Sequence, residues 1–213
     1  MVLGTSNIKI KGVSNLKEAS YNIMPDRIEA GTFLMAAAIT GGKVKIKSVV
    51  PNHISPLLLK LEEAGCKILI ETRSISLIAP KRLKAVSITT MPYPGFPTDL
   101  QSIFSSILTV AKGTSIVTEN IFENRFKIAP ELIRMGAKIT PTGKSILIKG
   151  VRKLHGSKVE ATDLRGGAAL VLAGLAAKGT TKISKIEYIL RGYENLDLKL
   201  SSLLANIKRE EAD

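Results

Sequence analysis

The sequence contains few of the residues that stabilise secreted proteins or hold proteins in membranes. Of its 213 residues one is cysteine, none is tryptophan and 4% are aromatic. One cysteine cannot form an internal disulfide, no apolar run reaches the ~18 residues of a membrane-spanning helix, and no signal peptide is recognisable. The 45% of hydrophobic residues argue against disorder. We therefore expect a globular protein of the cytoplasm with one large or two small domains.

The net charge of +13 admits nucleic acid, a membrane surface or small anionic molecules as partners. The lysines are scattered along the chain, and several alternate with apolar residues, as in KVKIK at 43–47. No set of aromatic residues accompanies them for stacking on bases. This pattern favours solvated faces of strands over a nucleic-acid patch. We expect neither a nucleic acid nor a membrane as partner.

The first eighty residues predict two strands followed by a helix-strand-helix-hairpin unit. Asp26 and Glu29 form the capping-box pattern that opens an apolar helix, and Gly41 and Gly42 end this helix. The expected elements are strands at 7–13 and 19–24, helices at 28–40 and 55–64, a strand at 43–49 and a hairpin over 67–79.

The same order of elements then recurs twice. Asp26, Asp99 and Asp163 each open a helix rich in Ala, Leu and Ile, and a strand follows each helix. One unit alone cannot bury both faces of its first helix, so we expect the units to pack these helices together at the centre of an α/β fold. The glycines that close the three helices are Gly42, Gly113 and Gly179, and the repeats cover about 25–80, 97–150 and 161–210.

Asp99 lies in PYPGFPTDLQ at 92–101, where a proline-rich loop leads into an apolar helix expected over 100–111. A carboxylate at a helix start is ordinarily a cap. The prolines, however, fix this loop more rigidly than a simple connection needs, which is typical of a loop that holds a substrate. If the apolar helices are parallel, Asp26, Asp99 and Asp163 meet at an end that favours phosphate or carboxylate groups. The aspartates there are either caps or working groups.

Three arginines are expected near the same end of the helices. Arg125 follows the second strand, Arg165 comes two residues after Asp163, and Arg191 lies in LRGYEN. Arginine binds carboxylate and phosphate through two parallel hydrogen bonds, so three of them in one cleft suit a doubly anionic small substrate. For each arginine taken singly, a surface ion pair is the alternative.

Long segments of the chain resemble a known enzyme family. PYPGFPTDLQ, VTENIFENRF, ELIRMGAKI, ATDLRGGAALVLAGLAAKGTT and RGYEN resemble the C-terminal half of the UDP-N-acetylglucosamine 1-carboxyvinyltransferases, also called UDP-N-acetylglucosamine enolpyruvyl transferases. MPDRIEAGTFLMAAAITGG resembles the same family, and the likeness runs from about Ile8 to Ile207. The shikimate enolpyruvyl transferases share the fold but lack these motifs. The resemblance implies an inside-out α/β barrel lobe of three βαβαββ units, one of two lobes that close on substrates.

The resemblance also implies a reaction. The family transfers enolpyruvyl from phosphoenolpyruvate to the 3-hydroxyl of UDP-N-acetylglucosamine with release of phosphate, in peptidoglycan precursor synthesis and without a cofactor. Asp99 is similar to the aspartate that deprotonates this hydroxyl, Asp163 to a supporting aspartate, and Ile121 to a residue whose backbone touches the nucleotide sugar. Arg125, Arg165 and Arg191 resemble the family's arginines that hold the carboxylate and phosphate of phosphoenolpyruvate.

Part of the family's machinery is expected on another chain or segment. The family's proton-donor loop with its cysteine lies in an N-terminal half, so we expect this chain to need that half as a partner and to be inactive alone. Residues 1–24 resemble closing strands of the first lobe, and residues 25–213 resemble the second lobe. In the family, the first residues of the full-length chain complete the edge of this second lobe. Cys66 is expected to be a small buried residue, and His53 and His155 lack metal-ligand spacing.

Two departures from the family pattern leave an alternative open. Leu190 replaces an aspartate that commonly precedes Arg191 in the family. Leu204 replaces a glycine that ends the last helix, which predicts loss of a left-handed cap position. These changes favour a noncatalytic, degenerate lobe that keeps the fold and an anion site. Nucleic-acid binding driven by charge ranks third.

Overall fold

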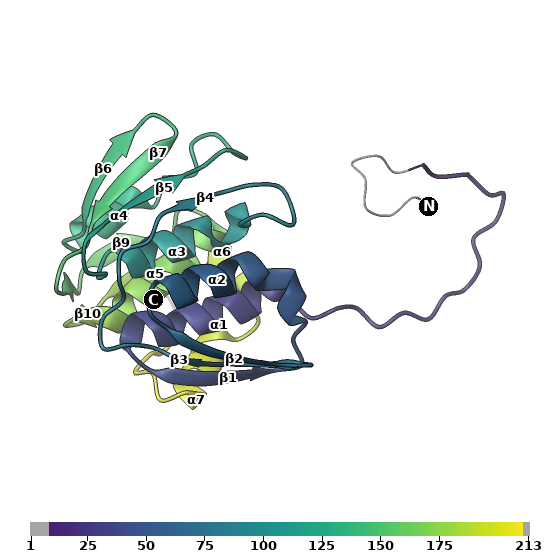
Figure 1. Cartoon of the computed structure of the whole chain (residues 1–213), viewed down its shortest axis with the longest axis horizontal. Coiled ribbons are helices and arrows are strands. Elements are labelled where there is room, and N and C mark those ends of the chain that lie inside the picture. Colours follow the sequence, from purple (N-terminus) through teal and green to yellow (C-terminus); the bar gives the residue numbers. More distant parts are fainter. Residues whose placement is uncertain (1–8, 211–213) are drawn as a thin grey trace.

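Three apolar helices pack against one another in the interior of a mixed α/β structure (Figure 1). They are α1 (Arg27–Thr40), α3 (Gln101–Leu108) and α5 (Leu164–Ala176). The computed structural model describes residues 9–210. Every residue of α3 is buried, and its polar side chains bond within the helix: Ser105 Oγ donates to the Gln101 carbonyl at 2.9 Å and Ser106 Oγ to the Ile103 carbonyl at 2.8 Å. Satisfied hydroxyls cost little in a core. The expected central position of the apolar helices is confirmed.

Shorter helices and four small sheets surround the three central helices. One sheet has the order β1-β3-β2, a second has the order β4-β5-β7-β6, and two parallel pairs join β10 to β8 and β11 to β9. The remaining helices are α2 (Ser55–Glu63), α4 (Ala129–Arg134), α6 (Glu187–Leu190), α7 (Leu196–Ser202) and the 3-10 turns η1 (Pro51–Ile54) and η2 (Thr98–Leu100). The strands are β1 (Lys43–Lys47), β2 (Lys67–Glu71), β3 (Ser74–Ile78), β4 (Ile88–Thr89), β5 (Thr114–Thr118), β6 (Lys138–Thr142), β7 (Ser145–Lys149), β8 (Leu154–His155), β9 (Lys158–Glu160), β10 (Ala177–Lys178) and β11 (Lys182–Ser184).

The first helix begins and ends where the sequence predicts. Asp26 caps α1 by accepting from the N–H groups of Ile28 at 2.7 Å and Glu29 at 3.3 Å. Gly41 ends it in the left-handed conformation, with φ of 71°. The prediction that the Glu29 side chain bonds back to Asp26, as in a complete capping box, is wrong. The Glu29 carboxylate instead binds Lys199 of α7 at 2.7 Å. The hairpin predicted over 67–79 is confirmed as β2 and β3.

The strands predicted at 7–13 and 19–24 are wrong for the part of the chain that the structure describes. Residues 9–24 form no strand, and Figure 1 shows them leading away from the body. Their alternating apolar side chains are exposed, including Ile10, Leu16 and Ile23. A strand needs a neighbouring strand for its backbone hydrogen bonds, and alternation alone does not supply one. Residues 7 and 8 of the prediction lie outside the described residues.

The third stretch of the chain departs from the first two. Antiparallel hairpins, β2-β3 and β6-β7, pair with β1 and β5, whereas β11 pairs only with the short parallel strand β9 among the described residues. The strand expected after the third apolar helix is short and covers Lys182–Ser184. The count of three equivalent units stays a prediction.

The expectation that Leu204 loses a left-handed position is wrong. Leu204 has φ of 70°, and its N–H donates to the Ser201 carbonyl at 2.9 Å. The turns at Gly65 and Gly136 have the same pattern, each N–H donating three residues back at 2.8 Å. The backbone hydrogen bonds therefore hold this turn without a glycine.

Leu204→Gly is expected to raise the free energy of unfolding by about 0.5–1 kcal/mol. A residue with a Cβ in the left-handed conformation costs ~1–2 kcal/mol, and relieving this cost is partly offset because glycine loses more backbone entropy on folding. Leu204 is 96% exposed, so its removal loses no packing. Urea denaturation of the chain measures the change. Leu203→Gly is the matched control, since Leu203 has φ of −94° and should be destabilised by glycine. Equal effects of the two substitutions would show that no strain is stored at Leu204.

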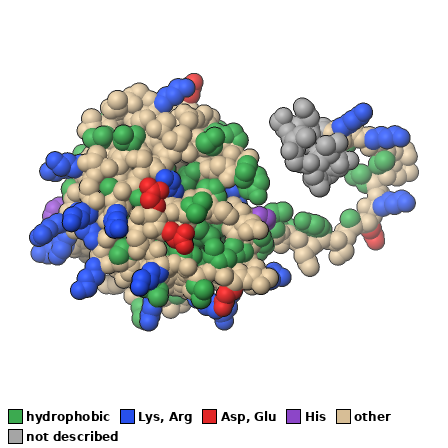
Figure 2. All heavy atoms as spheres, viewed as in Figure 1, with side chains coloured by type: hydrophobic (Ala, Val, Ile, Leu, Met, Phe, Trp, Pro, Cys, Tyr) green, Lys and Arg blue, Asp and Glu red, His purple; other side chains and the backbone are tan. Residues whose placement is uncertain are grey.

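On the face of the molecule drawn in Figure 2, the positive charge is unevenly distributed. Figure 2 shows Lys and Arg side chains gathered on the side of the body away from the N-terminal segment. None of the helices formed by residues 9–210 has both the length and the apolar character needed to cross a membrane. The expected lack of a nucleic-acid or membrane partner stays a prediction.

Candidate active site

Asp99 does not cap the helix that follows it. It is the second residue of the 3-10 turn η2, and no side chain caps either η2 or α3. Its carboxylate instead binds two arginines from distant segments: Oδ1 accepts from Arg125 Nη2 at 2.9 Å and Oδ2 from Arg165 Nη2 at 3.3 Å. The Asp99 side chain is 43% exposed, so the carboxylate stays open to solvent between the two guanidinium groups. Of the two possibilities that the sequence left open, Asp99 is not a cap.

Arg125 is held by the loop that follows β5. Its guanidinium lies 5.3 Å from the ring centre of Phe122, and Asn124 between them has a left-handed φ of 55°. Asparagine tolerates this conformation because its short side chain bonds locally. The turn directs Arg125 back toward Asp99. The Nε of Arg125 is buried and has no hydrogen-bond partner among the described residues.

Arg165 projects from the first turn of α5 and connects Asp99 to two further side chains. Its Nη1 donates to the Tyr193 hydroxyl at 3.4 Å, and Tyr193 in turn lies 2.9 Å from Thr32 Oγ1 of α1. Burial opposes the charge of Arg165, yet Tyr193 and Asp99 raise the pKa of Arg165 above its ordinary value. Burial also raises the pKa of Tyr193, so its phenol is protonated at neutral pH. The first turns of the central helices therefore meet at one end, as expected.

The other two aspartates are caps. Oδ1 of Asp163 accepts from the N–H groups of Arg165 and Gly166, both at 2.9 Å, and Asp26 does the same for α1. A side chain at Gly166 would place its Cβ 2.4 Å from Thr162 Oγ1, so the Thr162 side chain would have to move. Capping by Asp163 fixes the first turn of α5 and with it the start of the Arg165 side chain.

Among residues 9–210, neither Arg191 nor Ile121 forms a hydrogen bond or ion pair with Asp99, Arg125 or Arg165. Arg191 is exposed and forms no side-chain hydrogen bond or ion pair among residues 9–210. Leu190 beside it is 44% exposed and offers it no charge. The Ile121 N–H donates to Glu119 Oε1 at 2.8 Å, which leaves its carbonyl for other contacts. The roles that the resemblance implies for these two residues stay predictions.

The remaining reactive side chains lie outside the cluster. Cys66 is 6% exposed, and burial raises the pKa of its thiol to about 11. The carbonyl of His53 accepts from Arg27, and His155 is an exposed residue of the two-residue strand β8. No three His, Cys, Asp or Glu side chains of residues 9–210 are arranged to hold a metal ion. The small, buried position expected for Cys66 is confirmed.

Cys66 is expected to react slowly with a thiol reagent in the folded chain. Because its pKa lies about two pH units above the ordinary value, the thiolate fraction at pH 8 falls about 100-fold, and burial slows access further. Labelling with a chromogenic disulfide at pH 8, with and without urea, measures this. Equal rates in the folded and unfolded chain would contradict the buried position.

Three residues of this region were missed by the sequence reasoning. Tyr193 and Thr32 were visible only as members of longer motifs, and their contact joins residues 161 apart in the sequence. Glu119 is 3% exposed and accepts four hydrogen bonds beside the Asp99 loop. Its one signal in the sequence is a carboxylate directly after an apolar strand.

The cluster combines a solvent-open carboxylate with two cations. A carboxylate in this position can accept a proton, while guanidinium groups beside it can hold anionic groups of a substrate. A pocket of about 460 Å³ elsewhere in the structure is lined by neither Asp99 nor its arginines. The Asp99 carboxylate is 43% exposed beside two largely buried guanidinium groups, so the cluster can supply one wall of a cleft.

Comparison with known proteins gives consistent matches. A family model described as EPSP synthase (3-phosphoshikimate 1-carboxyvinyltransferase) matches residues 2–200. The chain is 54% identical over 209 residues to a UDP-N-acetylglucosamine 1-carboxyvinyltransferase of Myxococcus xanthus, covering 98% of this chain and 50% of that protein. It is 53% identical over 206 residues to the protein of the same name from Trichlorobacter lovleyi, covering 97% and 49%. The chain spans about half the length of the curated relatives it matches.

Solved structures agree with these matches. The enolpyruvyl transferase NikO from Streptomyces tendae superposes with a TM-score of 0.79 at 27% identity, covering 87% of this chain and 44% of that one. EPSP synthase from Acinetobacter baumannii gives 0.70 at 20% identity, covering 86% and 46%, which bears on the fold alone. The α/β fold class and the likeness predicted from the motifs are confirmed.

Proposed function

Because the chain belongs to the EPSP synthase family of enolpyruvyl transferases, we propose that it is the C-terminal part of an enzyme acting on UDP-N-acetylglucosamine. The enzyme would transfer enolpyruvyl from phosphoenolpyruvate to the 3-hydroxyl of the sugar nucleotide, release phosphate and serve peptidoglycan precursor synthesis in the cytoplasm. The observation that carries the proposal is the Asp99 carboxylate between Arg125 and Arg165.

The residues of the cluster suit this reaction. In the addition, the sugar hydroxyl gives its proton to Asp99, its oxygen forms a bond to C2 of phosphoenolpyruvate, and the methylene carbon takes up a proton. In the later elimination, the C–O bond to phosphate breaks and the methyl carbon gives up a proton, which restores the double bond. Arg125 and Arg165 are positioned to hold the carboxylate and phosphate charges. Arg191 would join them once substrate is bound. In the same proposal Asp163 supports the reacting centre by fixing Arg165, and the Ile121 backbone touches the nucleotide.

The N-terminal half is the partner that this proposal requires. The proton that must reach the methylene carbon of phosphoenolpyruvate has no donor in the Asp99 cluster, since Arg165 keeps its proton and the Tyr193 hydroxyl is buried between Arg165 and Thr32. Residues 1–24 would join the sheet of the first lobe, which supplies the strand partners that residues 9–24 lack. The chain alone is expected to have no activity.

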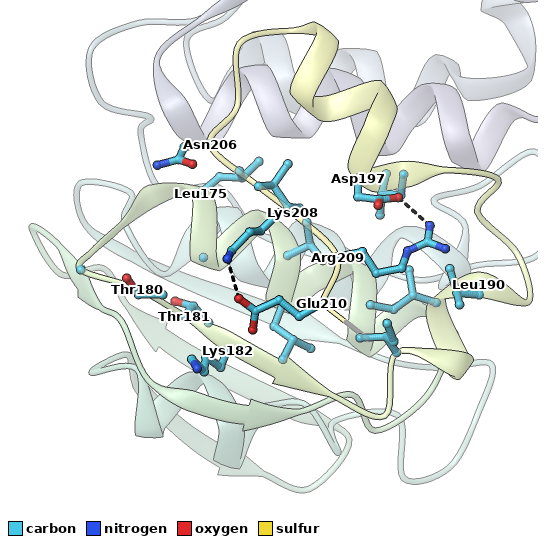
Figure 3. Close-up of a pocket in the computed structure, with 18 residues that line it drawn as sticks. Leu175, Thr180, Thr181, Lys182, Leu190, Asp197, Asn206, Lys208, Arg209 and Glu210 are labelled. Carbon is cyan, nitrogen blue, oxygen red and sulfur yellow. Dashed lines mark hydrogen bonds and ion pairs between the residues drawn. The ribbon is translucent and has the colours of Figure 1, made fainter. Parts of the chain in front are cut away.

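An unfilled edge of the fold supports the same partner. Figure 3 shows the pocket of about 460 Å³ between α5, β11, α6 and residues 206–210, with Arg209 bound to Asp197 at 2.7 Å. Residues of β11 line it, and β11, unlike β1 and β5, pairs with no antiparallel hairpin among the described residues. We propose that a segment of the N-terminal half completes this edge, which would make the lobe an inside-out barrel of three repeats, 25–80, 97–150 and 161–210.

Reconstitution tests the proposal. The chain is mixed with a separately produced N-terminal half of a close relative, and phosphate release from phosphoenolpyruvate and UDP-N-acetylglucosamine is followed. We expect turnover from the mixture and none from either half. A folded, associated pair without turnover would contradict the proposal, and turnover by this chain alone would show that its proton donor lies within it.

A degenerate lobe with an anion site is the second candidate. Arg191 forms no hydrogen bond or ion pair with the cluster among the described residues, and Leu190 beside it offers no charge, which favours this alternative. The two candidates differ in ligand-induced stability, because a ligand that binds the native state must raise its melting temperature. The transferase predicts a rise for the reconstituted pair with both substrates. No rise with UDP-N-acetylglucosamine, whether or not phosphoenolpyruvate raises the melting temperature through an anion site, would favour the degenerate lobe.

A further inference from the structure

Glu119 is a buried carboxylate without a cationic partner among the described residues. It follows β5 directly, is 3% exposed and takes part in no ion pair of residues 9–210. Burying a carboxylate is costly unless hydrogen bonds satisfy it. Here four donors do so, which indicates that the surrounding loops are arranged around this side chain.

The four donors come from the two loops that carry Asp99 and Arg125. Oε2 accepts from Thr98 Oγ1 at 3.0 Å, and Thr98 is the residue directly before Asp99. Oε1 accepts from Thr90 Oγ1 at 2.8 Å and from the N–H groups of Ile121 at 2.8 Å and Phe122 at 3.1 Å. One carboxylate thus fastens the start of η2 to the turn that leads to Arg125.

The attachment continues through the backbone. The Thr90 hydroxyl that donates to Glu119 also accepts from the Asn120 N–H at 2.9 Å, and the Thr90 N–H donates to the Thr118 carbonyl at 3.0 Å. The Glu119 N–H donates to the Lys144 carbonyl at 2.9 Å, in the β6-β7 hairpin. The backbone of Glu119 is therefore fixed to the sheet, and the hydrogen bonds of its side chain hold both loops in place relative to that sheet.

We propose that Glu119 is a positioning residue that sets the separation of Asp99 and Arg125. Its effect on catalysis rests on the proposed function, whereas its effect on the geometry of the two loops does not. It touches no reacting atom and moves no proton. A shift of the loops by about 1 Å would misplace the base relative to the substrate, which typically costs on the order of 100-fold in rate.

Two substitutions of Glu119, to glutamine and to alanine, distinguish an effect of its hydrogen bonds from an effect of its charge. In Glu119→Gln the amide oxygen can keep the three bonds of Oε1, and its N–H can donate to the Thr98 hydroxyl, which rotates to accept. Glu119→Ala removes all four bonds and leaves two N–H groups without a partner. Thr98→Val removes only the bond next to Asp99 and keeps the side-chain volume, so it serves if the alanine variant fails to fold.

The first readout needs no activity. In the chain alone, amide hydrogen exchange of Ile121 and Phe122 and the guanidinium NMR signals of Arg125 report the two loops. We expect parent-like protection in Glu119→Gln, and exchange at least about tenfold faster with loss of the Arg125 signals in Glu119→Ala. Unchanged protection in the alanine variant would overturn the proposal. Glu131→Ala is the control, since Glu131 accepts a backbone bond from Glu160 at 3.1 Å and pairs with Arg134, away from Asp99.

The second readout uses the reconstituted pair. We expect kcat to fall about 100-fold in Glu119→Ala, about tenfold in Thr98→Val and less than about threefold in Glu119→Gln. A glutamine variant as slow as the alanine variant would show that the charge of Glu119 acts in the reaction, and an alanine variant with parent-like kcat would show that the bonds only stabilise the fold. If the parent pair has no turnover, the proposed function has failed, and the exchange measurements alone decide the positioning role.

Discussion

Asp99→Asn in the reconstituted pair is expected to lower kcat by about 10³-fold, since losing a general base costs on the order of 10²–10⁴. The amide has nearly the same shape but cannot take the hydroxyl proton. In the parent, the Asp99 carboxylate accepts hydrogen bonds from Arg125 at 2.9 Å and from Arg165 at 3.3 Å. The amide of asparagine would point an N–H group at one of these two arginines. Phosphate release in single-turnover and steady-state assays measures the effect.

The two kinetic constants distinguish the base from a binding residue. Because Arg125 and Arg165 remain, we expect KM for phosphoenolpyruvate to change far less than kcat. Glu71→Gln, which removes an exposed carboxylate paired with Lys45 on the outer hairpin, is the matched control and should keep parent activity. An Asp99→Asn pair within tenfold of the parent would remove Asp99 from the role of base.

Phe104→Ala is expected to lower the free energy of unfolding by about 3–5 kcal/mol, the range for truncating a buried phenylalanine. Phe104 is fully buried in α3 and meets Phe96 edge-on, with ring centres 5.3 Å apart and planes at 77°. Phe96 belongs to the proline-rich loop before Asp99. The substitution should therefore loosen this loop as well as the core, and denaturation of the chain in urea measures the loss.

Leu69→Ala is the control for the core substitution. Leu69 is 62% exposed on β2, and its truncation should change the free energy of unfolding by less than about 0.5 kcal/mol. If Phe104→Ala costs no more than Leu69→Ala, the packing of α3 at the centre of the structure is wrong.

Local sequence signals predicted most of the elements. The cap at Asp26, the left-handed end of α1 at Gly41 and the hairpin of β2 and β3 depend on neighbours close in the sequence, and all are confirmed. The alternation in residues 9–24 predicted strands and failed, because a strand also needs a partner that local sequence does not contain.

The candidate site was predictable in part. The repeated pattern placed Asp99, Arg125 and Arg165 at one end of the helices, and the structure brings these three together. The pattern could not tell Asp99 from the capping aspartates, because all three precede apolar helices. The difference is the 3-10 turn η2, which places Asp99 beyond the cap position, and that turn has no distinct signal in the sequence.

Tyr193 and Glu119 could not be assigned from the sequence because their roles depend on contacts through space. A buried phenol or carboxylate is recognisable only from the hydrogen-bond partners around it. These are Thr32 and Arg165 for Tyr193, and they come from two loops for Glu119. The repeat nevertheless predicted the region in which both residues lie.

The contact between Thr32 and Tyr193 has a consequence for the order of folding. It joins residues 161 apart, and among residues 9–210 the hydrogen bonds that connect Asp99 to them run through Arg165. Contacts of such long sequence separation form late, because a long loop must be closed before they contribute. We therefore expect the contact between Thr32 and Tyr193, and the ordering of Arg165 beside Tyr193, to form late, and a spectroscopic probe at Arg165 would test whether the helices form earlier.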